Sequence, residues 1–335
     1  MSRTEQGQWR RSFALLYSAL AVFFALYAAE YLRRFPIAVL AKASLYVCLM
    51  LYLLLALAPG FPVPRSILRE RLRGIRGAAC STLLFLLPYL IYCTGTGDFR
   101  WPAFGKLLAL CFAPFLLFGT VPPRRTERLH WVDVAVLLWL LLPVVFGWIG
   151  GIWGVPENLD FMVRIFLLGV GAWSFLVLRG LEGSGYDFRW DAATVRDSLV
   201  GLAGFTVIAL PLGFALGFIA WNPRFRGAGD LLLDYATIFL FIAIFEEFFF
   251  RGVLQNLIER SLQSRYMAQG VAAVIFGLSH IRHAPVPNWR YVLLASVAGW
   301  FYGGAYRNHQ NLMASASLHA LVDTVWRTWL TSPKH

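Results

Sequence analysis

Apolar runs of about 20 residues recur along the whole chain, and no other feature constrains its fold as strongly. A helix needs ~20 residues to cross the ~30 Å hydrocarbon layer of a membrane. The runs lie at 12–32, 37–59, 78–95, 104–121, 131–153, 161–178, 199–221, 231–258, 267–284, 289–305 and 312–330. The sequence therefore predicts an all-α fold, a polytopic membrane helix bundle of roughly eleven transmembrane helices.

The composition supports a membrane protein. Of the 335 residues, 59% are hydrophobic and 14% are charged, whereas a soluble domain is about 25% charged. The formal net charge of +12 suits loops that lie against anionic lipid. Because the sequence contains no nucleic-acid-binding motif, we expect the lipid bilayer, and no nucleic acid, as a partner.

The distribution of basic residues predicts the orientation. Two loops are rich in arginine, while the loop between them, GVPENLD at 154–160, is acidic, so the positive-inside rule places the N-terminus in the cytoplasm. The arginines of the two loops are Arg65, Arg69, Arg71, Arg73, Arg76, Arg124, Arg125 and Arg128. The first span is longer than a signal-peptide core and should remain as an anchor. We expect a multi-pass protein of a cell membrane, the bacterial inner membrane in particular.

A polar segment, RGLEGSGYDFRWDAATVRDS at 179–198, divides the chain. The spans before it carry almost no ionisable residues at mid-depth, and the spans after it carry several. We therefore predict an N-terminal multi-span region at 1–180 without an assigned role, a cytoplasmic linker at 181–198, and a domain at 199–335 that performs the chemistry and holds the active site inside its bundle.

The segment FEEFFFRG at 245–252 places three charges within an apolar run. Glu246 and Glu247 fall near the middle of the predicted span, where each charged side chain costs at least ~3 kcal/mol. At about 100° per residue, Glu247 and Arg251 lie one turn apart and can pair, whereas Glu246 and Arg251 diverge by about 140°. We therefore predict that Glu247 is a structural ion-pair partner and that Glu246 has a functional role.

Two more groups of polar residues lie at comparable depth. The segment VIFGLSHI ends in His280, and SASLHALVDTVWR aligns Ser315, His319, Asp323 and Arg327 at four-residue steps on one helix face. A single histidine inside a membrane is often only a hydrogen-bonded packing residue. Two histidines with an unpaired glutamate and an aspartate, on three helices, form a constellation that packing explains poorly.

These residue types suit peptide-bond hydrolysis in a water-accessible cavity. A carboxylate can take a proton from water, one imidazole can orient that water or protonate a leaving amine, and another can stabilise an oxyanion. The same residues could ligate zinc, and their spacing does not decide between the two. A transporter would also carry ionisable residues at mid-depth, but the first half of the chain contains no repeat of these motifs. A serine hydrolase is disfavoured because the members of a triad rarely share one helix face.

Four motifs follow one another in the second half of the chain. They are Glu246-Glu247-x-x-x-Arg251 followed by Gly252, Phe276-x-x-x-His280, Gly299-x-x-x-Gly303 and His319-x-x-x-Asp323. In order and spacing they resemble the motifs of the CPBP family, the type II CAAX prenyl endopeptidases and related bacterial Abi and bacteriocin-processing membrane proteins. The resemblance covers about residues 198–335 and implies an intramembrane endopeptidase that cleaves a membrane-associated or lipidated protein or peptide.

The resemblance also implies roles for individual residues. Glu246 would be the base that activates water, with His280 beside it, and His319 and Asp323 would stabilise the oxyanion. Glu247 and Arg251 would support them. Because no HExxH motif is present, we expect a metal-free site without a cofactor. In a zinc-dependent version the ligands would be Glu246, His280, His319 and Asp323. A family member that binds without catalysis is a further alternative.

Asp323 departs from the family pattern, in which asparagine is common at this position. An ionised aspartate cannot donate a hydrogen bond to an oxyanion. It could instead orient His319, pair with Arg327, ligate a metal, or remain protonated in an apolar site. The sequence leaves these alternatives open.

Overall fold

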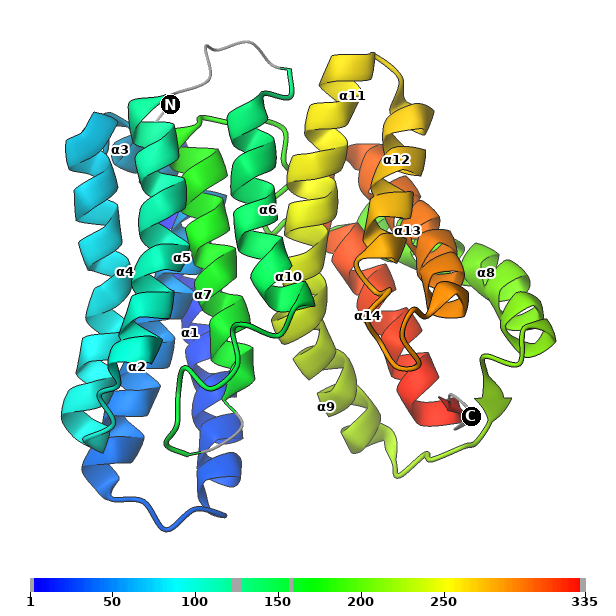
Figure 1. The fold of residues 1–335 in the computed structure, drawn as a ribbon, viewed down its shortest axis with the longest axis horizontal. Coiled ribbons are helices and arrows are strands. Elements are labelled where there is room, and N and C mark those ends of the chain that lie inside the picture. The colour runs from blue at the N-terminus through cyan, green and yellow to red at the C-terminus, as the bar shows by residue number, and fades with distance from the viewer. Residues whose placement is uncertain (1–2, 122–127, 157–158, 332–335) are drawn as a thin grey trace. The chain divides into compact units, whose positions relative to one another are not determined.

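The computed structural model describes residues 3–121, 128–156 and 159–331. Its contacts divide the chain into two compact units, one that ends at Leu181 and one that begins at Glu182 and also includes residues 128 and 129. Each unit is built mainly from helices (Figure 1). Arg124, Arg125 and Glu157, which contribute to the predicted orientation, lie outside the described residues.

The first unit is a bundle of mostly long apolar helices. Its helices are α1 Arg3–Leu32, α2 Val39–Leu57, the 3₁₀ turn η1 Ala58–Gly60, α3 Pro62–Arg71, α4 Gly74–Thr96, α5 Trp101–Thr120, α6 Trp131–Val145, α7 Asp160–Ala172 and its π-helical continuation η2 Trp173–Leu178.

Aromatic rings and one buried ion pair hold this first unit together. The Phe85 ring packs edge-on against Phe166 at 5.9 Å and Trp173 at 5.4 Å between ring centroids. Asp133 and Arg179 form a buried ion pair in which Nε lies 2.7 Å from Oδ1. Breaking a buried pair of this kind costs several kcal/mol, about 3–5. These contacts give the unit a structural core, and its role stays unassigned.

The second unit contains the predicted motifs. Its elements are α8 Ala192–Ala215, β1 Ala220–Trp221, α9 Ala228–Ile238, the π-helix η3 Phe239–Ala243, α10 Ile244–Glu247, the π-helix η4 Phe248–Gln255, α11 Asn256–Leu262, α12 Arg265–Leu278, α13 Trp289–His309, α14 Leu312–Trp329 and β2 Leu330–Thr331. The two short strands pair antiparallel, with Ala220 opposite Thr331.

The elements from α9 to α11 form one continuous helix of 35 residues, Ala228–Leu262. A single α-helical turn, α10, carries both glutamates, and π-helical segments lie on either side of it. A π-helix is rare, and single π turns inside helices are found frequently at functional sites. The helix geometry therefore singles out the same turn as the charge pattern does.

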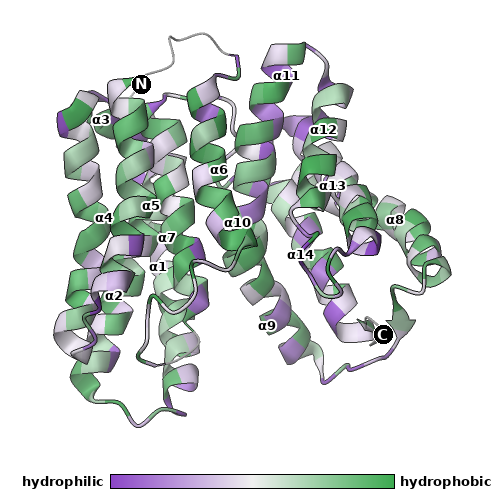
Figure 2. Ribbon diagram, in the orientation of Figure 1, coloured by the Kyte–Doolittle hydropathy of each residue, from purple (hydrophilic) through white to green (hydrophobic). Residues whose placement is uncertain are grey.

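Among the described residues, seven helices are long and apolar enough to cross a membrane. They are Trp9–Leu32, Val39–Gly60, Gly74–Thr96, Trp101–Thr120, Asp160–Leu178, Ala192–Ala215 and Ala228–Leu262. Most of their residues are coloured as hydrophobic in Figure 2, whereas α14 carries several hydrophilic positions. This fits a multi-pass membrane protein.

The prediction of roughly eleven transmembrane helices is thus too high by this criterion, although every predicted segment contains a helix. The helix α6 has 15 residues and α12 has 14, so α12 is only ~21 Å long. The segment predicted at 267–284 ends its helix at Leu278, and Pro285 and Pro287, which lack a backbone N–H, follow. The helices α13 and α14 have sufficient length, but polar and charged residues lower their hydropathy.

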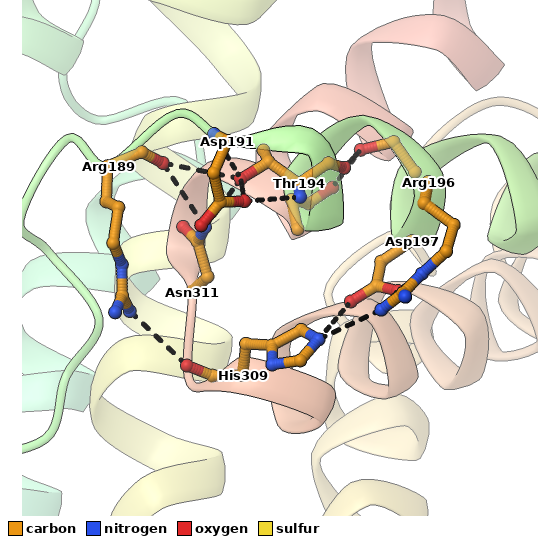
Figure 3. Close-up of polar contacts among 9 residues, drawn as sticks. Arg189, Asp191, Thr194, Arg196, Asp197, His309 and Asn311 are labelled. Carbon is orange, nitrogen blue, oxygen red and sulfur yellow. Dashed lines mark hydrogen bonds and ion pairs between the residues drawn. The ribbon is translucent and has the colours of Figure 1, made fainter.

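The helix α8 begins within the segment predicted as a linker. Asp191 caps it, since its carboxylate accepts a hydrogen bond from the backbone N–H of Thr194 at 2.8 Å and its own backbone N–H donates to the Thr194 hydroxyl at 3.3 Å. The Asn311 side chain, from the turn before α14, donates to the Thr194 hydroxyl at 2.8 Å (Figure 3). This polar cluster ties the start of α8 to the start of α14, the helix that carries His319.

Candidate active site

The carboxylate of Glu247 is fully buried, and both of its oxygens have close polar partners. Its Oε1 accepts from Nη1 of Arg251 at 3.2 Å and lies 2.8 Å from Nδ1 of His319. Its Oε2 accepts a short hydrogen bond from the Ser315 hydroxyl and lies 3.1 Å from Nε of Arg251. The predicted pairing of Glu247 with Arg251 is therefore present, and four polar atoms of three side chains surround one carboxylate.

Arg251 is also fully buried, and aromatic rings surround its charge. Its guanidinium lies 4.5 Å from the Phe276 ring centroid and 5.4 Å from that of Tyr302, distances at which a cation is attracted to the face of a ring. Its Nη2 donates to the carbonyl oxygen of Gly299 at 3.0 Å. These contacts fix Arg251, and Arg251 in turn fixes Glu247.

Gly299 makes this arrangement possible because α13 passes very close to α12 at this point. A Cβ at position 299 would lie 3.0 Å from the Cα of Ala273 and 3.2 Å from Nη2 of Arg251. At Gly303 a Cβ would lie 2.6 Å from Oε1 of Gln255. The small-xxx-small pair predicted from the sequence thus permits a close helix approach.

Glu246 has the opposite environment to its neighbour. Its side chain is 21% exposed, and its Oε2 lies 4.0 Å from Nε2 of His319. Among the described residues the Glu246 carboxylate has no hydrogen-bond donor, as the helical spacing predicts. It is the accessible carboxylate of the pair.

His319 lies between three carboxylates. Its Nδ1 faces Glu247, and its Nε2 lies 3.5 Å from Oδ2 of Asp323. Because carboxylates only accept hydrogen bonds, a ring protonated on both nitrogens satisfies both neighbours. Of the alternatives for Asp323, orientation of His319 fits this geometry, whereas Arg327 pairs with Asp234 of α9 at 3.3 Å. The Asp323 side chain is 39% exposed.

His280 lies in the turn just after α12, and a hydrogen bond fixes its ring. Nδ1 is 2.9 Å from the carbonyl oxygen of Phe276, an acceptor only, so Nδ1 carries the proton. Among the described residues, Nε2 of His280 has no hydrogen-bond partner. The Phe276 ring lies between the two histidines, at 4.8 Å from His280 and 5.8 Å from His319.

The structure therefore brings Glu246, Glu247, His319 and Asp323 into one cluster, with Arg251 behind it and His280 next to Phe276. The assignment of catalytic roles to these residues stays a prediction. Sequence reasoning placed Ser315 on the right helix face but gave it no part in the site. It missed Tyr302, whose ring stacks on His319 at 4.6 Å. Tyr302 directly precedes Gly303 of the glycine motif, and this position was the one sequence feature that could have indicated a place near the site.

The metal-free site stays a prediction. Within residues 3–121, 128–156 and 159–331 no three side chains of His, Cys, Asp or Glu are grouped so that they could hold one ion. Glu247, the most deeply buried carboxylate, already binds Arg251, Ser315 and His319. The four residues that a zinc-dependent version would use do not form a ligand set here.

Part of the second unit is similar to a known protein family. Residues 228–325 match the family described as type II CAAX prenyl endopeptidase Rce1-like. This segment covers the glutamate motif, His280, His319 and Asp323. The predicted resemblance to the CPBP and CAAX protease family is therefore confirmed. No curated protein and no solved structure matches the chain.

Proposed function

We propose, from the match of residues 228–325 to the type II CAAX prenyl endopeptidase family, that the chain is an intramembrane endopeptidase. It hydrolyses a peptide bond of a membrane-associated or lipidated protein or peptide, and Glu246 activates the attacking water. The site lies inside the helical bundle of the second unit. The protein is expected to span a cell membrane, in particular the bacterial inner membrane, with its N-terminus in the cytoplasm.

One observation supports the assignment of Glu246 as the general base. Two adjacent glutamates have opposite environments: four polar atoms surround the Glu247 carboxylate and leave no oxygen for water, while Glu246 has no such donor and is partly exposed. A general base needs a carboxylate that can reach a water molecule. Glu246 meets this need, and Glu247 instead positions His319.

The reaction then needs two proton transfers. Glu246 takes a proton from water as the water oxygen bonds to the carbonyl carbon, and the carbonyl oxygen becomes an oxyanion. The doubly protonated His319, 4.0 Å from Glu246, stabilises this charge. The carbon–nitrogen bond breaks as Glu246 returns the proton to the leaving nitrogen, which gives a carboxylic acid and an amine. His280 can accept a hydrogen bond from the water at Nε2.

Comparative membrane proteomics tests this proposal and does not require an identified substrate. Membranes of cells with the wild-type protein are compared with membranes of a Glu246→Gln strain. We expect C-terminal or leader peptides of a few proteins to persist only in the variant. Identical peptide profiles in the two strains, with equal amounts of folded protein, would contradict the proposed activity.

A further inference from the structure

Ser315 of α14 is fully buried, and its hydroxyl lies between two groups that contact His319. The hydroxyl donates a hydrogen bond to Oε2 of Glu247, and it lies 3.0 Å from the backbone carbonyl oxygen of Tyr302. Glu247 contacts Nδ1 of His319 at 2.8 Å, and the Tyr302 ring stacks on the imidazole at 4.6 Å between ring centroids. One hydroxyl therefore joins two of the neighbours that hold this imidazole.

Among the described residues, the Ser315 hydroxyl is the one hydrogen-bond donor to Oε2 of Glu247. Nε of Arg251 lies 3.1 Å from this oxygen but makes no hydrogen bond, so it contributes as an ion-pair partner alone. A hydroxyl has one proton, and an ionised acceptor makes the stronger bond, so this proton points to Glu247 rather than to the Tyr302 carbonyl oxygen. Without Ser315, Oε2 would be a buried oxygen without a hydrogen bond, and the carboxylate would lose a contact that sets its rotation.

The burial of Ser315 limits it to an indirect role. Its side chain is 0% exposed, so the hydroxyl is out of reach of a substrate. His319 does reach the accessible part of the site, where its Nε2 lies 4.0 Å from Glu246 and 3.5 Å from Asp323. Both nitrogens belong to one rigid ring, so a rotation of the Glu247 carboxylate that moves Nδ1 also turns Nε2. Any effect of Ser315 on the reaction therefore passes through Glu247 and His319.

We infer that Ser315 is a positioning residue. Its hydroxyl fixes the Glu247 carboxylate, and this carboxylate holds the imidazole of His319 so that Nε2 faces the oxyanion of the tetrahedral intermediate. This inference rests on the proposed hydrolase function. It gives a role to a residue that lies one turn before His319 on the same face of α14 and that the proposed reaction does not otherwise use.

Kinetics of Ser315→Ala tests the inference, with Ser317→Ala as the matched control on the same helix. Ser317 is also buried, and its hydroxyl forms a hydrogen bond of 2.8 Å with the hydroxyl of Tyr235. Each variant removes one buried hydroxyl, so both should lower Tm by a similar amount. The purified full chain is assayed in proteoliposomes with a quenched-fluorescent farnesylated peptide. We expect kcat of Ser315→Ala to fall about 10²-fold with KM unchanged, the usual effect of misplacing a group by about 1 Å, and kcat of Ser317→Ala to stay at the wild-type value.

Binding of a farnesylated peptide phosphinate, whose tetrahedral P–O⁻ group resembles the oxyanion, gives a measurement independent of turnover. Ser315→Ala should weaken phosphinate binding about 10²-fold when His319 is present. In a His319→Ala background the same change should have no further effect, because residues that act as a unit are not additive. A residue that only stabilised the fold would not show this dependence on His319.

The inference and the proposed function fail in different ways. Wild-type kcat in Ser315→Ala, or a loss of phosphinate affinity that is equally large in the His319→Ala background, would overturn the role of Ser315 alone. Failure of the wild-type protein to cleave the farnesylated peptide or any membrane peptide would overturn the proposed function itself.

Discussion

The neighbouring residues Glu246 and Glu247 differ in burial and in polar contacts, because their side chains point to different surroundings. Glu247 and Arg251 are both fully buried, and each compensates the charge of the other. Removal of one member of a buried pair leaves an unpaired charge and costs about 3–5 kcal/mol. The network around Glu247 therefore holds His319 in place, whereas the Glu246 carboxylate stays partly exposed.

Asp323 provides a prediction at the residue scale. Asp323→Asn should retain activity to within about tenfold, because the amide oxygen can still accept a hydrogen bond from Nε2 of His319. Asp323→Ala removes the acceptor, and kcat should fall by about 10² or more. The measurement is kcat of the purified variants in proteoliposomes, with chelator present and absent, and chelator should have no effect.

The zinc-dependent alternative predicts a different result. Asp323→Asn would then lose a ligand charge, and activity should fall steeply. Stoichiometric zinc in the purified protein, lost together with activity on chelation and restored on addition of zinc, would contradict the metal-free site.

The sequence predicted the contacts and shared faces of residues that lie on the same helix. The pairing of Glu247 with Arg251 and the shared face of Ser315, His319 and Asp323 follow from about 100° per residue. The packing of the Tyr291 ring of α13 against His280 and Phe218 could not be predicted. His280 lies in the turn after α12, and Phe218 lies in the segment before β1. Periodicity within one helix contains no information on which residues of other helices meet it.

At the scale of elements, the close approach of α12 and α13 gives a second prediction. Gly299→Val should destabilise the protein by about 1–3 kcal/mol, because its Cβ would press on the Ala273 backbone and on Arg251. The displacement of Arg251 should also lower activity. Thermal unfolding in detergent measures the loss of stability, and a peptide-cleavage assay measures the loss of activity.

Gly270 on α12 is the matched control. A Cβ there meets only the Trp300 ring, at an ordinary 3.7 Å, so Gly270→Ala should be neutral or stabilising by up to about 1 kcal/mol. Equal Tm values for Gly299→Val and Gly270→Ala would contradict the account of the glycine motif.

The cap of α8 gives a pH-dependent prediction. Hydrogen bonds from the backbone and side chain of Thr194 lower the pKa of Asp191 (Figure 3). Since the folded pKa lies below the unfolded value of about 3.9, the cap stabilises the protein at neutral pH and this contribution is lost as pH falls through the folded pKa. Asp191→Ala should therefore lower Tm at pH 7, and the difference from wild type should shrink in acid. A difference that is constant from pH 7 to pH 3 would contradict this role.

Every predicted apolar run contains a helix, but α3 lies outside these runs, and only seven described helices are long and apolar enough to cross a membrane. The helices α13 and α14 have the length for a span, yet polar and charged residues, among them His319 and Asp323 of α14, lower their hydropathy. The early end of α12 at Leu278 depends on the local turn that follows, which a window average of hydropathy does not detect. The π-helical segments beside Glu246 and Glu247 were likewise not predictable from the apolar pattern.

For the whole molecule, we predict that water reaches the site through the helices that carry the motifs. In a background without Cys48, Cys80, Cys93 and Cys111, a cysteine at Asp323 should react with a water-soluble thiol reagent. A cysteine at Val207 of α8, which is 74% exposed on an apolar helix, should be protected because it faces lipid. Labelling is measured in intact membranes, and protection at position 323 would contradict the hydrated cavity.

The central claim is that Glu246 is the base of an intramembrane hydrolase and that Glu247 is not. The most direct test compares kcat and Tm of purified Glu246→Gln and Glu247→Gln in proteoliposomes. We predict that Glu246→Gln loses at least about 10² in kcat and keeps the wild-type Tm, whereas Glu247→Gln lowers the free energy of unfolding by about 3 kcal/mol or more. Equal residual activity and equal Tm in the two variants would contradict the account.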